Sequence, residues 1–207
     1  MSTGAAPSRT IPEALKSLPA ASLYEAAGKR GDMAPHIRSL AGGKRVAGFA
    51  FTLRTLPGDN LGVFHAINKA QRDDVLVIDA GGTDRVTIWG GTSAIAAHAK
   101  GIAGCVTNAA IRDVAEIDVL GFPVFAAGIS VRGATKNHAG WMNVSVCVGE
   151  VTVNPGDFIV GDEDGVVVIA AADIATVVAR ATELEGRHLL RDSRLRAGES
   201  LASVMEL

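Results

Sequence analysis

Apolar residues alternate with small or polar residues in one long segment and form short continuous runs in several others. In residues 46–54 the side chains of Ala47, Phe49, Phe51 and Leu53 fall on one side, which predicts a half-buried strand. The other segments expected to form strands are residues 75–79, 86–89, 102–107, 124–127, 142–148, 150–153, 158–161 and 166–170. The segments expected to form helices are residues 11–18, 22–29, 61–70, 92–100, 113–120 and 173–196.

The order of these segments predicts one α/β domain that covers residues 1–207. Strands and helices alternate up to about residue 127, a strand-rich stretch follows, and a long helix closes the chain. This order is typical of a layered domain with parallel and antiparallel strands in a mixed sheet. Residues 1–10 are expected to be a loose arm and residues 31–43 a connector. The helix of residues 173–196 carries many charges, so it presents a solvated face or reaches a neighbouring subunit.

Several polar residues are expected to shape helix starts and turns. Ser22 is placed to cap the helix that it begins, and Asn60 is placed to cap helix 61–70. Asp59 is interpreted as a turn residue, and residues 162–165 as the turn of a hairpin.

Composition and charge exclude several classes of function. The chain is 48% hydrophobic and 20% charged, so it can bury a substantial core. Aromatic residues are only 4% and the net charge is −2, which indicates no nucleic-acid or membrane-surface partner. No apolar run reaches a membrane-spanning length of about 20 residues, and the N-terminus lacks the apolar core of a signal peptide. Cys105 and Cys147 lie in apolar runs, which predicts small core residues in a reducing, cytoplasmic compartment.

The stretch from Trp89 to Glu116 contains the strongest candidate chemistry. Gly90 and Gly91 precede a helix, and the free N–H groups at a helix start attract anions. A carboxylate or phosphate would sit on the amides near Thr92 and Ser93. The pattern alone favours a plainer interpretation, a tight turn in which Thr92 or Ser93 caps the helix.

Arg112 and Asp113 are the second candidate pair. The guanidinium fork of Arg112 suits a carboxylate or an enolate oxygen, and the carboxylate of Asp113 suits a hard cation. An alternative is that Asp113 and Glu116 form the D-x-x-E capping box of the following helix. The two interpretations are compatible, because a capping Asp keeps one free carboxylate oxygen. Weaker candidates for contact with a ligand are His65, Arg132, Lys136 and His138.

Several motifs together resemble a known family. They are VLVIDAGG, WGG, IRDVAEID, GFPVFA and VNPGDFIVGDEDGVVVI. The chain resembles the RraA-like family, which holds the metal-dependent 4-hydroxy-4-methyl-2-oxoglutarate / 4-carboxy-4-hydroxy-2-oxoadipate aldolases and the regulator of ribonuclease activity A. The most specific element is Gly91, then twenty residues, then Arg112 and Asp113, with Glu116 after two more.

The resemblance implies a β/β/α swivelling-type domain that assembles into trimers or pairs of trimers. It implies a divalent metal, Mg²⁺ or Mn²⁺, near Asp113, and contact between Arg112 and a bound pyruvate unit. The amides that follow Gly91, around Ser93, would hold the pyruvate carboxylate. In related aldolases an Asp often stands where this chain has Gly91, which leaves metal affinity and substrate identity open. Those aldolases also use a C-terminal Glu from the adjacent subunit, here Glu183 or Glu185.

The expected activity is therefore cleavage of a 4-hydroxy-2-oxo acid with two or three carboxylates to pyruvate and a second oxo acid. Decarboxylation of oxaloacetate is an expected side activity, because it passes through the same pyruvate enolate. Two alternatives stay open: a non-catalytic regulator of ribonuclease activity, and an enzyme of the same fold acting on another oxo or hydroxy acid. The Asp after Arg112 favours catalysis, because the regulators resemble the aldolases but lack it.

Overall fold

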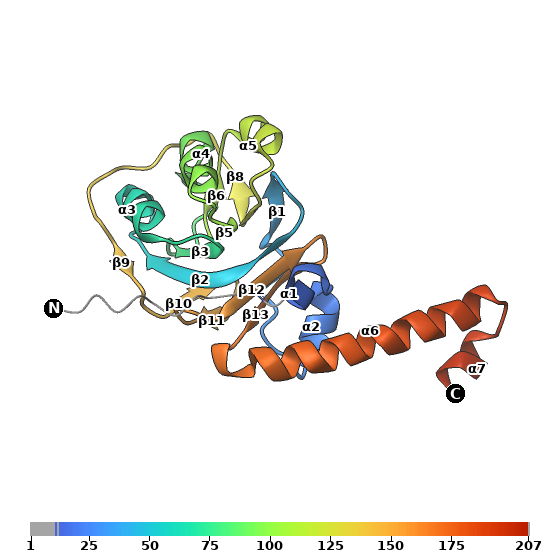
Figure 1. Ribbon diagram of the computed structural model, residues 1–207. Coiled ribbons are helices and arrows are strands. Elements are labelled where there is room, and N and C mark those ends of the chain that lie inside the picture. Colours follow the sequence, from blue (N-terminus) through green and yellow to red (C-terminus); the bar gives the residue numbers. More distant parts are fainter. Residues whose placement is uncertain (1–10, 12, 207) are drawn as a thin grey trace.

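An eight-stranded mixed sheet forms the centre of the protein, which a computed structural model describes for residue 11 and residues 13–206 (Figure 1). The sheet order is β1-β7-β5-β3-β2-β12-β13, and β9 pairs with β2. Its strands are β1 Arg38–Ala41, β2 Val46–Arg54, β3 Asp74–Asp79, β5 Gly104–Thr107, β7 Val124–Ala126, β9 Trp141–Met142, β12 Phe158–Asp162 and β13 Gly165–Ile169. The strands β2, β3, β5 and β7 are parallel, and antiparallel strands flank them. The predicted mixed α/β sheet is confirmed, whereas the expected arm of residues 1–10 lies outside the described residues.

A small second sheet explains how distant parts of the sequence meet. It consists of the parallel strands β4 Thr87–Trp89, β6 Ala110–Ile111 and β8 Gly128–Ile129. The carboxyl ends of parallel strands lie at the same edge of a sheet. Because these strands end at Trp89, Ile111 and Ile129, the chain leaves all three at one edge, and Gly90 and Arg112 are brought together there.

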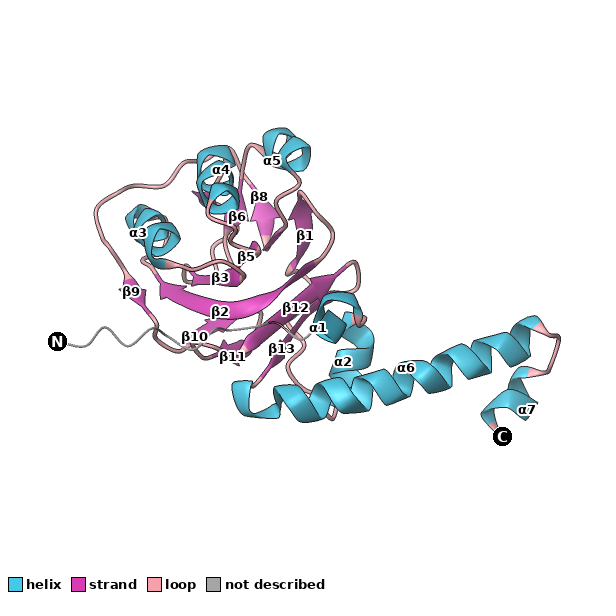
Figure 2. Ribbon diagram, viewed as in Figure 1, coloured by secondary structure: helices cyan, strands magenta, loops and turns pink. Residues whose placement is uncertain are grey.

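The helices cover both faces of the large sheet (Figure 2). One face carries α3 Leu61–Lys69, α4 Gly91–Ala99 and α5 Val114–Leu120. The other side carries α1 Glu13–Ser17, α2 Ala20–Ala26, the hairpin of β10 Val146–Val148 and β11 Val151–Val153, the 3₁₀ turn Ala171–Asp173 and α6 Ile174–Arg196. The helix α6 extends beyond the body of the protein and leads to α7 Leu201–Met205 (Figure 1).

The strand β2 is buried more fully than its alternating pattern predicted. Phe51 and Leu53 pack in the core beneath α3, α4 and α5, while Val46 and Ala50 pack in a second core cluster. The strands β3 and β12 pair with the two edges of β2, and the two core clusters cover its two faces. The prediction of a half-buried strand was therefore wrong in its burial, although its bounds are confirmed.

Other local predictions were also wrong, for reasons of tertiary contact. The expected connector 31–43 contains β1, which forms because it pairs with β7. The expected strand 142–148 is divided at Asn143, whose φ of 53° breaks an extended strand. Ser22 lies inside α2, which begins after Pro19, and its hydroxyl donates to Glu185. Cys147 is exposed, while Cys105 is buried as expected.

No helix in the described part of the chain is both long enough and apolar enough to cross a membrane.

Candidate active site

Both residues of the Arg-Asp pair and most of the predicted glycine turn line one cavity of about 310 Å³; Gly91 is the predicted residue that does not. This volume is at the small end of the range for ligand pockets and suits a small organic acid. The residues that line the cavity are Asn60, Phe64, Thr87, Trp89, Gly90, Thr92, Ser93, Arg112, Asp113, Gly133, Ala134 and Lys136. They come from the edge of the small sheet, from the starts of α3 and α4, and from the loop after β8.

The start of α4 forms one part of the cavity wall. Gly90 occupies the N-cap position in an extended conformation, so neither Thr92 nor Ser93 caps the helix as the pattern favoured. The amide of Gly91 donates to Asp113 Oδ2 at 3.0 Å. The next amides of the helix have no acceptor within it. Thr92 and Ser93 therefore bring free N–H groups to the cavity, where an anion is favoured.

Asp113 stands between β6 and α5 in a left-handed conformation, with φ 60° and ψ 36°. This conformation is unfavourable for most residues, and Asp tolerates it better than most. The side chain makes no capping bond to α5, so the predicted capping box does not form. It instead turns toward α4, and within the described chain its Oδ1 has no hydrogen-bond partner. A strained backbone that aims a free carboxylate oxygen at a cavity is typical of functional sites.

Glu116 places its carboxylate against the glycine at position 91. A side chain added at Gly91 would overlap the carboxylate of Glu116, which lies against that glycine. In the same way, a Cβ at Gly90 would come within 2.7 Å of Asp113 Oδ2. The two carboxylates thus flank the start of α4. Glu116 occupies the space that an Asp side chain at position 91 would need.

Arg112 is held at the cavity by its backbone and leaves its guanidinium accessible. Its N–H donates to the carbonyl of Trp89 at 3.1 Å, and the buried ring of Trp89 stacks on Phe122 with centroids 5.8 Å apart. The Arg112 side chain is 50% exposed and its Nε lies 3.6 Å from Asp113 Oδ2. A Cβ at Gly133 would lie 3.3 Å from Arg112 Nη1, so glycine lets the loop approach the guanidinium.

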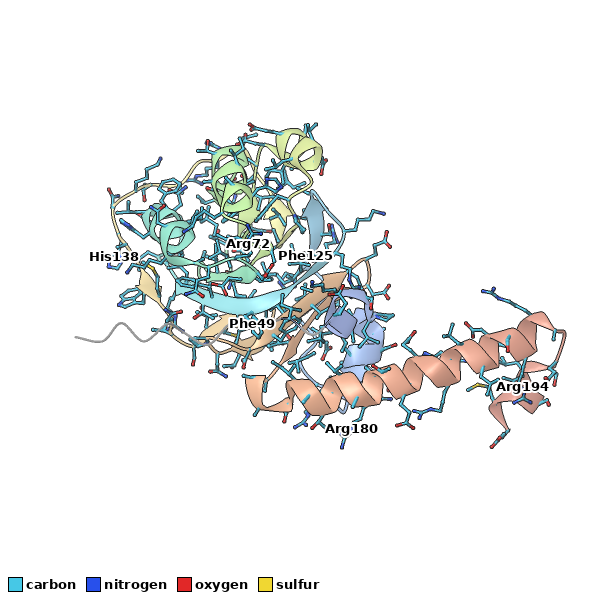
Figure 3. All side chains as sticks on the ribbon, in the orientation of Figure 1. Phe49, Arg72, Phe125, His138, Arg180 and Arg194 are labelled. Carbon is cyan, nitrogen blue, oxygen red and sulfur yellow. The ribbon has the colours of Figure 1, made fainter. Side chains whose placement is uncertain are left out.

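Of the basic residues that the sequence offered in the loop after β8, one lies at the cavity. Lys136 lines the cavity, whereas Arg132, His138 and His65 do not. The ring of His138 packs against Trp141 at a centroid distance of 4.9 Å, at the outer side of the loop (Figure 3). His65 is exposed on α3, and its neighbour Phe64 faces the cavity instead.

Sequence reasoning missed the role of the residues before α3. Asn60 was expected to cap α3, but it makes no capping bond. Asp59 Oδ1 instead accepts from the amide of Leu61 at 3.0 Å. Asn60 lines the cavity, and its buried Oδ1 has no hydrogen-bond partner in the described structure. A buried acceptor without a partner at a cavity wall indicates a place for a donor on a ligand.

Asp59 is a buried carboxylate with four hydrogen-bond donors. They are the backbone N–H groups of Asn137, Leu61 and His138 and the hydroxyl of Thr135. Desolvation opposes ionisation of this group, but the four hydrogen bonds outweigh it and lower the pKa of Asp59 below its ordinary value. Asp59 is therefore charged at neutral pH, and three of the four groups that stabilise the charge belong to the loop after β8.

Comparison with known proteins identifies the family. A family model described as RraA-like, Aldolase/RraA, matches residues 20–168. The chain belongs to the RraA-like family. A protein of Halalkalibacterium halodurans named "Putative 4-hydroxy-4-methyl-2-oxoglutarate aldolase" is 36% identical over 166 residues, which cover 80% of this chain and 79% of that protein. The resemblance seen in the sequence motifs is confirmed.

Two solved structures show the same fold. An uncharacterized protein from Pseudomonas syringae has a TM-score of 0.83 at 27% identity, and the match covers 94% of this chain and 92% of that one. The RNA-processing inhibitor RraA from Thermus thermophilis has a TM-score of 0.67 at 31% identity, over 73% of this chain and 92% of that one. The RraA-like family thus contains proteins named for catalysis and proteins named for inhibition.

In this RraA-like chain the two C-terminal glutamates lie away from the cavity. Glu183 pairs with Arg187 at 2.6 Å, and Glu185 accepts from Ser22 and lies 3.2 Å from His188 Nδ1. Both are on α6, on the side of the sheet opposite α4 and α5 (Figure 1). Neither reaches the cavity of its own chain, so a contribution from a neighbouring subunit stays a prediction.

Proposed function

We propose that the protein is a divalent-metal-dependent aldolase that cleaves a 4-hydroxy-2-oxo acid with two or three carboxylates, releasing pyruvate and a second oxo acid. One observation carries the proposal: a single small cavity combines a free helix start, the guanidinium of Arg112 and the carboxylate of Asp113. The carboxylate of Glu116 lies beside that helix start, against Gly91. The aldolase name of the Halalkalibacterium halodurans relative supports it. The presence of Asp113 next to Arg112 favours this activity over the inhibitory role of other family members.

The cavity can bind the pyruvate half of such a substrate through two kinds of contact. The amides at the start of α4, near Thr92 and Ser93, suit its carboxylate, because they have no acceptor within the helix. Arg112 suits the neighbouring carbonyl oxygen, on which negative charge develops during cleavage. The partnerless Oδ1 of Asn60 suits a hydroxyl donor. These groups would fix the substrate with its C3–C4 bond inside the cavity.

Cleavage requires that the electron pair of the C3–C4 bond be stabilised. Loss of the C4 hydroxyl proton to water turns C4 into a carbonyl, and the bond electrons pass to the pyruvate fragment as an enolate. Arg112 stabilises the enolate oxygen, and a proton added at C3 gives pyruvate. Decarboxylation of oxaloacetate leaves the same enolate when carbon dioxide departs, so it is part of the proposal as a side activity.

The residues fit a hard divalent cation such as Mg²⁺ or Mn²⁺. Asp113 Oδ2 accepts from Gly91, whereas Asp113 Oδ1 and the carboxylate of Glu116 have no hydrogen-bond partner among the described residues. Asp113 lines the cavity, and Glu116 lies against Gly91 beside it. No group of three or more His, Cys, Asp and Glu side chains that could hold a metal occurs among the described residues. Mg²⁺ accepts one or two carboxylates with water and substrate oxygens as its other ligands. When bound, the metal would supply Lewis-acid polarisation of the C2 carbonyl.

Pyruvate release tests the proposed function directly. It is measured from racemic 4-carboxy-4-hydroxy-2-oxoadipate and separately from oxaloacetate, each with Mg²⁺, with Mn²⁺ and with EDTA. We expect release from both substrates with either metal and none with EDTA. Release from oxaloacetate alone would indicate another hydroxy or oxo acid as the substrate. No release from either would contradict the aldolase proposal and favour a protein-binding role.

Glu116 and Gly91 are expected to act on metal affinity as one unit. Glu116→Gln should weaken activation by Mg²⁺ by about 10- to 100-fold, the usual effect of losing a carboxylate around a metal site. Gly91→Ala should give a similar loss, because its methyl group displaces Glu116. The double variant should lose no more than either single variant, since both changes remove one contact.

Mg²⁺ titration of pyruvate release measures these effects, with thermal melting to check the fold. Gly186→Ala is the matched control, because an added methyl group there meets open space on α6. Additive losses in the double variant, or an unchanged Mg²⁺ response in Gly91→Ala, would show that Glu116 does not serve the metal.

We also infer assembly into a trimer or a pair of trimers. Support comes from the second half of α6 and from α7, where the large apolar side chains of Leu189, Leu190, Leu201 and Met205 are exposed. Exposed apolar groups gathered on neighbouring elements are typical of interfaces. A cytoplasmic location belongs to the same proposal and is supported by the two free cysteines.

A further inference from the structure

We propose that Lys136 binds a second carboxylate of the substrate, and that Asp59 is the positioning residue that holds the loop carrying Lys136 against the cavity. This inference rests on the proposed function, because it assigns the part of the cavity that would recognise the rest of the substrate. It concerns the segment of residues 130–140, called here the cavity loop.

Lys136 is a cation at the cavity without an acidic partner. It is one of the lining residues, and in the described structure it forms no ion pair with any carboxylate. Its Nζ lies 5.9 Å from the centre of the Phe64 ring, which also lines the cavity. Contact with an aromatic face holds an ammonium group without neutralising its charge. The α4 amides are assigned to the pyruvate carboxylate and Arg112 to the neighbouring carbonyl oxygen, so Lys136 is available for a second carboxylate.

The cavity loop follows the short strand β8 and contains no helix and no named strand of its own. Other contacts must therefore fix the position of Lys136. Backbone hydrogen bonds hold it at Ser130, Arg132 and Thr135. The amide of Ser130 donates to Ile111 O at 3.0 Å, and the amide of Thr87 donates to Arg132 O at 2.8 Å. Thr135 donates to Gly58 O at 2.8 Å and accepts from the amide of Asn60 at 2.9 Å. Between Arg132 and Thr135, Gly133 and Ala134 line the cavity. The position of Lys136 therefore depends on hydrogen bonds made by the residues that follow it.

The carboxylate of Asp59 accepts these hydrogen bonds. Its Oδ2 accepts from the Thr135 hydroxyl at 2.8 Å and from the amide of Asn137 at 2.7 Å, and its Oδ1 lies 3.3 Å from the amide of His138. Lys136 is thus held between bonded residues on both sides. Asp59 itself is only 4% exposed, so the acceptor side of these bonds is withdrawn from water.

Glycine makes the close packing of the cavity loop on α3 possible. A Cβ added at Gly62 would come within 2.5 Å of the carbonyl oxygen of Ala139. The cavity loop therefore lies directly on the first turn of α3. Asp59 comes immediately before that turn, so its carboxylate can reach three residues of the cavity loop. Without the Asp59 carboxylate, the N–H groups of Asn137 and His138 would lose their acceptor, which favours opening of the loop.

Equilibrium binding with Mg²⁺ tests the role of Lys136 without requiring turnover. The probes are 2-oxoglutarate, which has two carboxylates, and pyruvate, which has one, each measured by calorimetry. Lys136→Met should weaken the affinity for 2-oxoglutarate by about tenfold or more, the effect of losing one charged hydrogen bond, and leave the affinity for pyruvate unchanged. Lys69→Met is the matched control, since Lys69 lies on α3 but does not line the cavity.

Asp59→Asn tests the positioning role. It should weaken 2-oxoglutarate selectively, and the double variant with Lys136→Met should bind no more weakly than Lys136→Met alone. Hydrogen exchange at Asn137 and His138 should become faster. Thr135→Val, which removes one of the bonds, should give a smaller effect. Asp157→Asn is the matched control, because Asp157 is similarly buried and accepts from the amides of Asn154 and Ala171, away from the cavity.

Each outcome decides between the proposals. Equal weakening of both probes by Lys136→Met, or no weakening, would overturn the assignment of a second carboxylate to Lys136. Additive losses of 2-oxoglutarate affinity in the double variant would overturn the positioning role of Asp59. Unchanged hydrogen exchange at Asn137 and His138 in Asp59→Asn would overturn it as well. If both probes bind as expected but no substrate is cleaved, the proposed aldolase activity fails while the assignment of Lys136 and Asp59 stands.

Discussion

Asp113→Asn is expected to lower the rate of metal-dependent pyruvate release by about 10³-fold or more while the fold is retained. Asn tolerates the left-handed conformation of this position, and its side-chain oxygen can still accept from the amide of Gly91. What it removes is the negative charge that would hold a divalent cation. Losing Lewis-acid stabilisation costs several kcal/mol of transition-state energy, and each 1.4 kcal/mol is about tenfold in rate.

The choice of substitution decides what this experiment measures. Ala at position 113 would remove the charge and also leave an unfavourable residue in a left-handed conformation, so a loss of activity would mix two causes. The control is Asp118→Asn, on the same helix, whose Oδ1 accepts from the amide of Gly42 and which does not line the cavity. Steady-state rates across a Mg²⁺ series and a melting curve for each variant give the answer. A loss of less than tenfold in Asp113→Asn would remove Asp113 as the metal site.

Arg112→Ala is expected to lower kcat by at least about 10²-fold, the effect of losing one contact to charge that develops in the transition state. The backbone of Arg112 follows the short strand β6 and donates to the carbonyl of Trp89, which places the side chain at the cavity. Arg112→Lys should recover only part of the activity, because lysine keeps the charge but lacks the planar fork of donors.

Single-turnover and steady-state measurements of pyruvate release separate this effect from weaker binding. The matched control is Arg132→Ala, a cation of the cavity loop that does not line the cavity and whose bond to Thr87 uses its backbone carbonyl. A kcat for Arg112→Ala within tenfold of the unmodified protein would argue against the role of Arg112 in stabilising the enolate.

Much of the fold could be predicted because its signals are local. The bounds of β2 and the existence of β3, α4 and α6 follow from runs and periods of apolar residues within a few positions of one another. The strand β1 could not be found in this way, because Arg38–Ala41 has no clear pattern and becomes a strand through pairing with β7. The exposure of Cys147 has the same origin, since β10 lies in a two-stranded hairpin outside the main sheet.

The candidate site likewise combines residues that local patterns reveal with residues whose role depends on long-range contacts. Gly90, Gly91, Arg112 and Asp113 could be named in advance, because glycines before a helix and an adjacent Arg-Asp pair have chemical meaning at short range. Asp59 was interpreted as a turn residue, since its partners in the cavity loop are more than 70 positions away in the chain. Nothing in the local sequence distinguishes such a carboxylate from any other in a turn.

The sequence by itself determined the class of fold, the family, the glycine turn and the cation and carboxylate offered for chemistry. The tertiary structure alone decided that β4 and β6 are parallel neighbours, which brings Gly90 and Arg112 to one cavity. It also decided that Glu116 fills the space beside Gly91 and that Lys136, among the loop cations, faces the cavity. The physical reason is that strand pairing and side-chain contacts join residues far apart in the chain, whereas periodicity and capping patterns report only on neighbours along it.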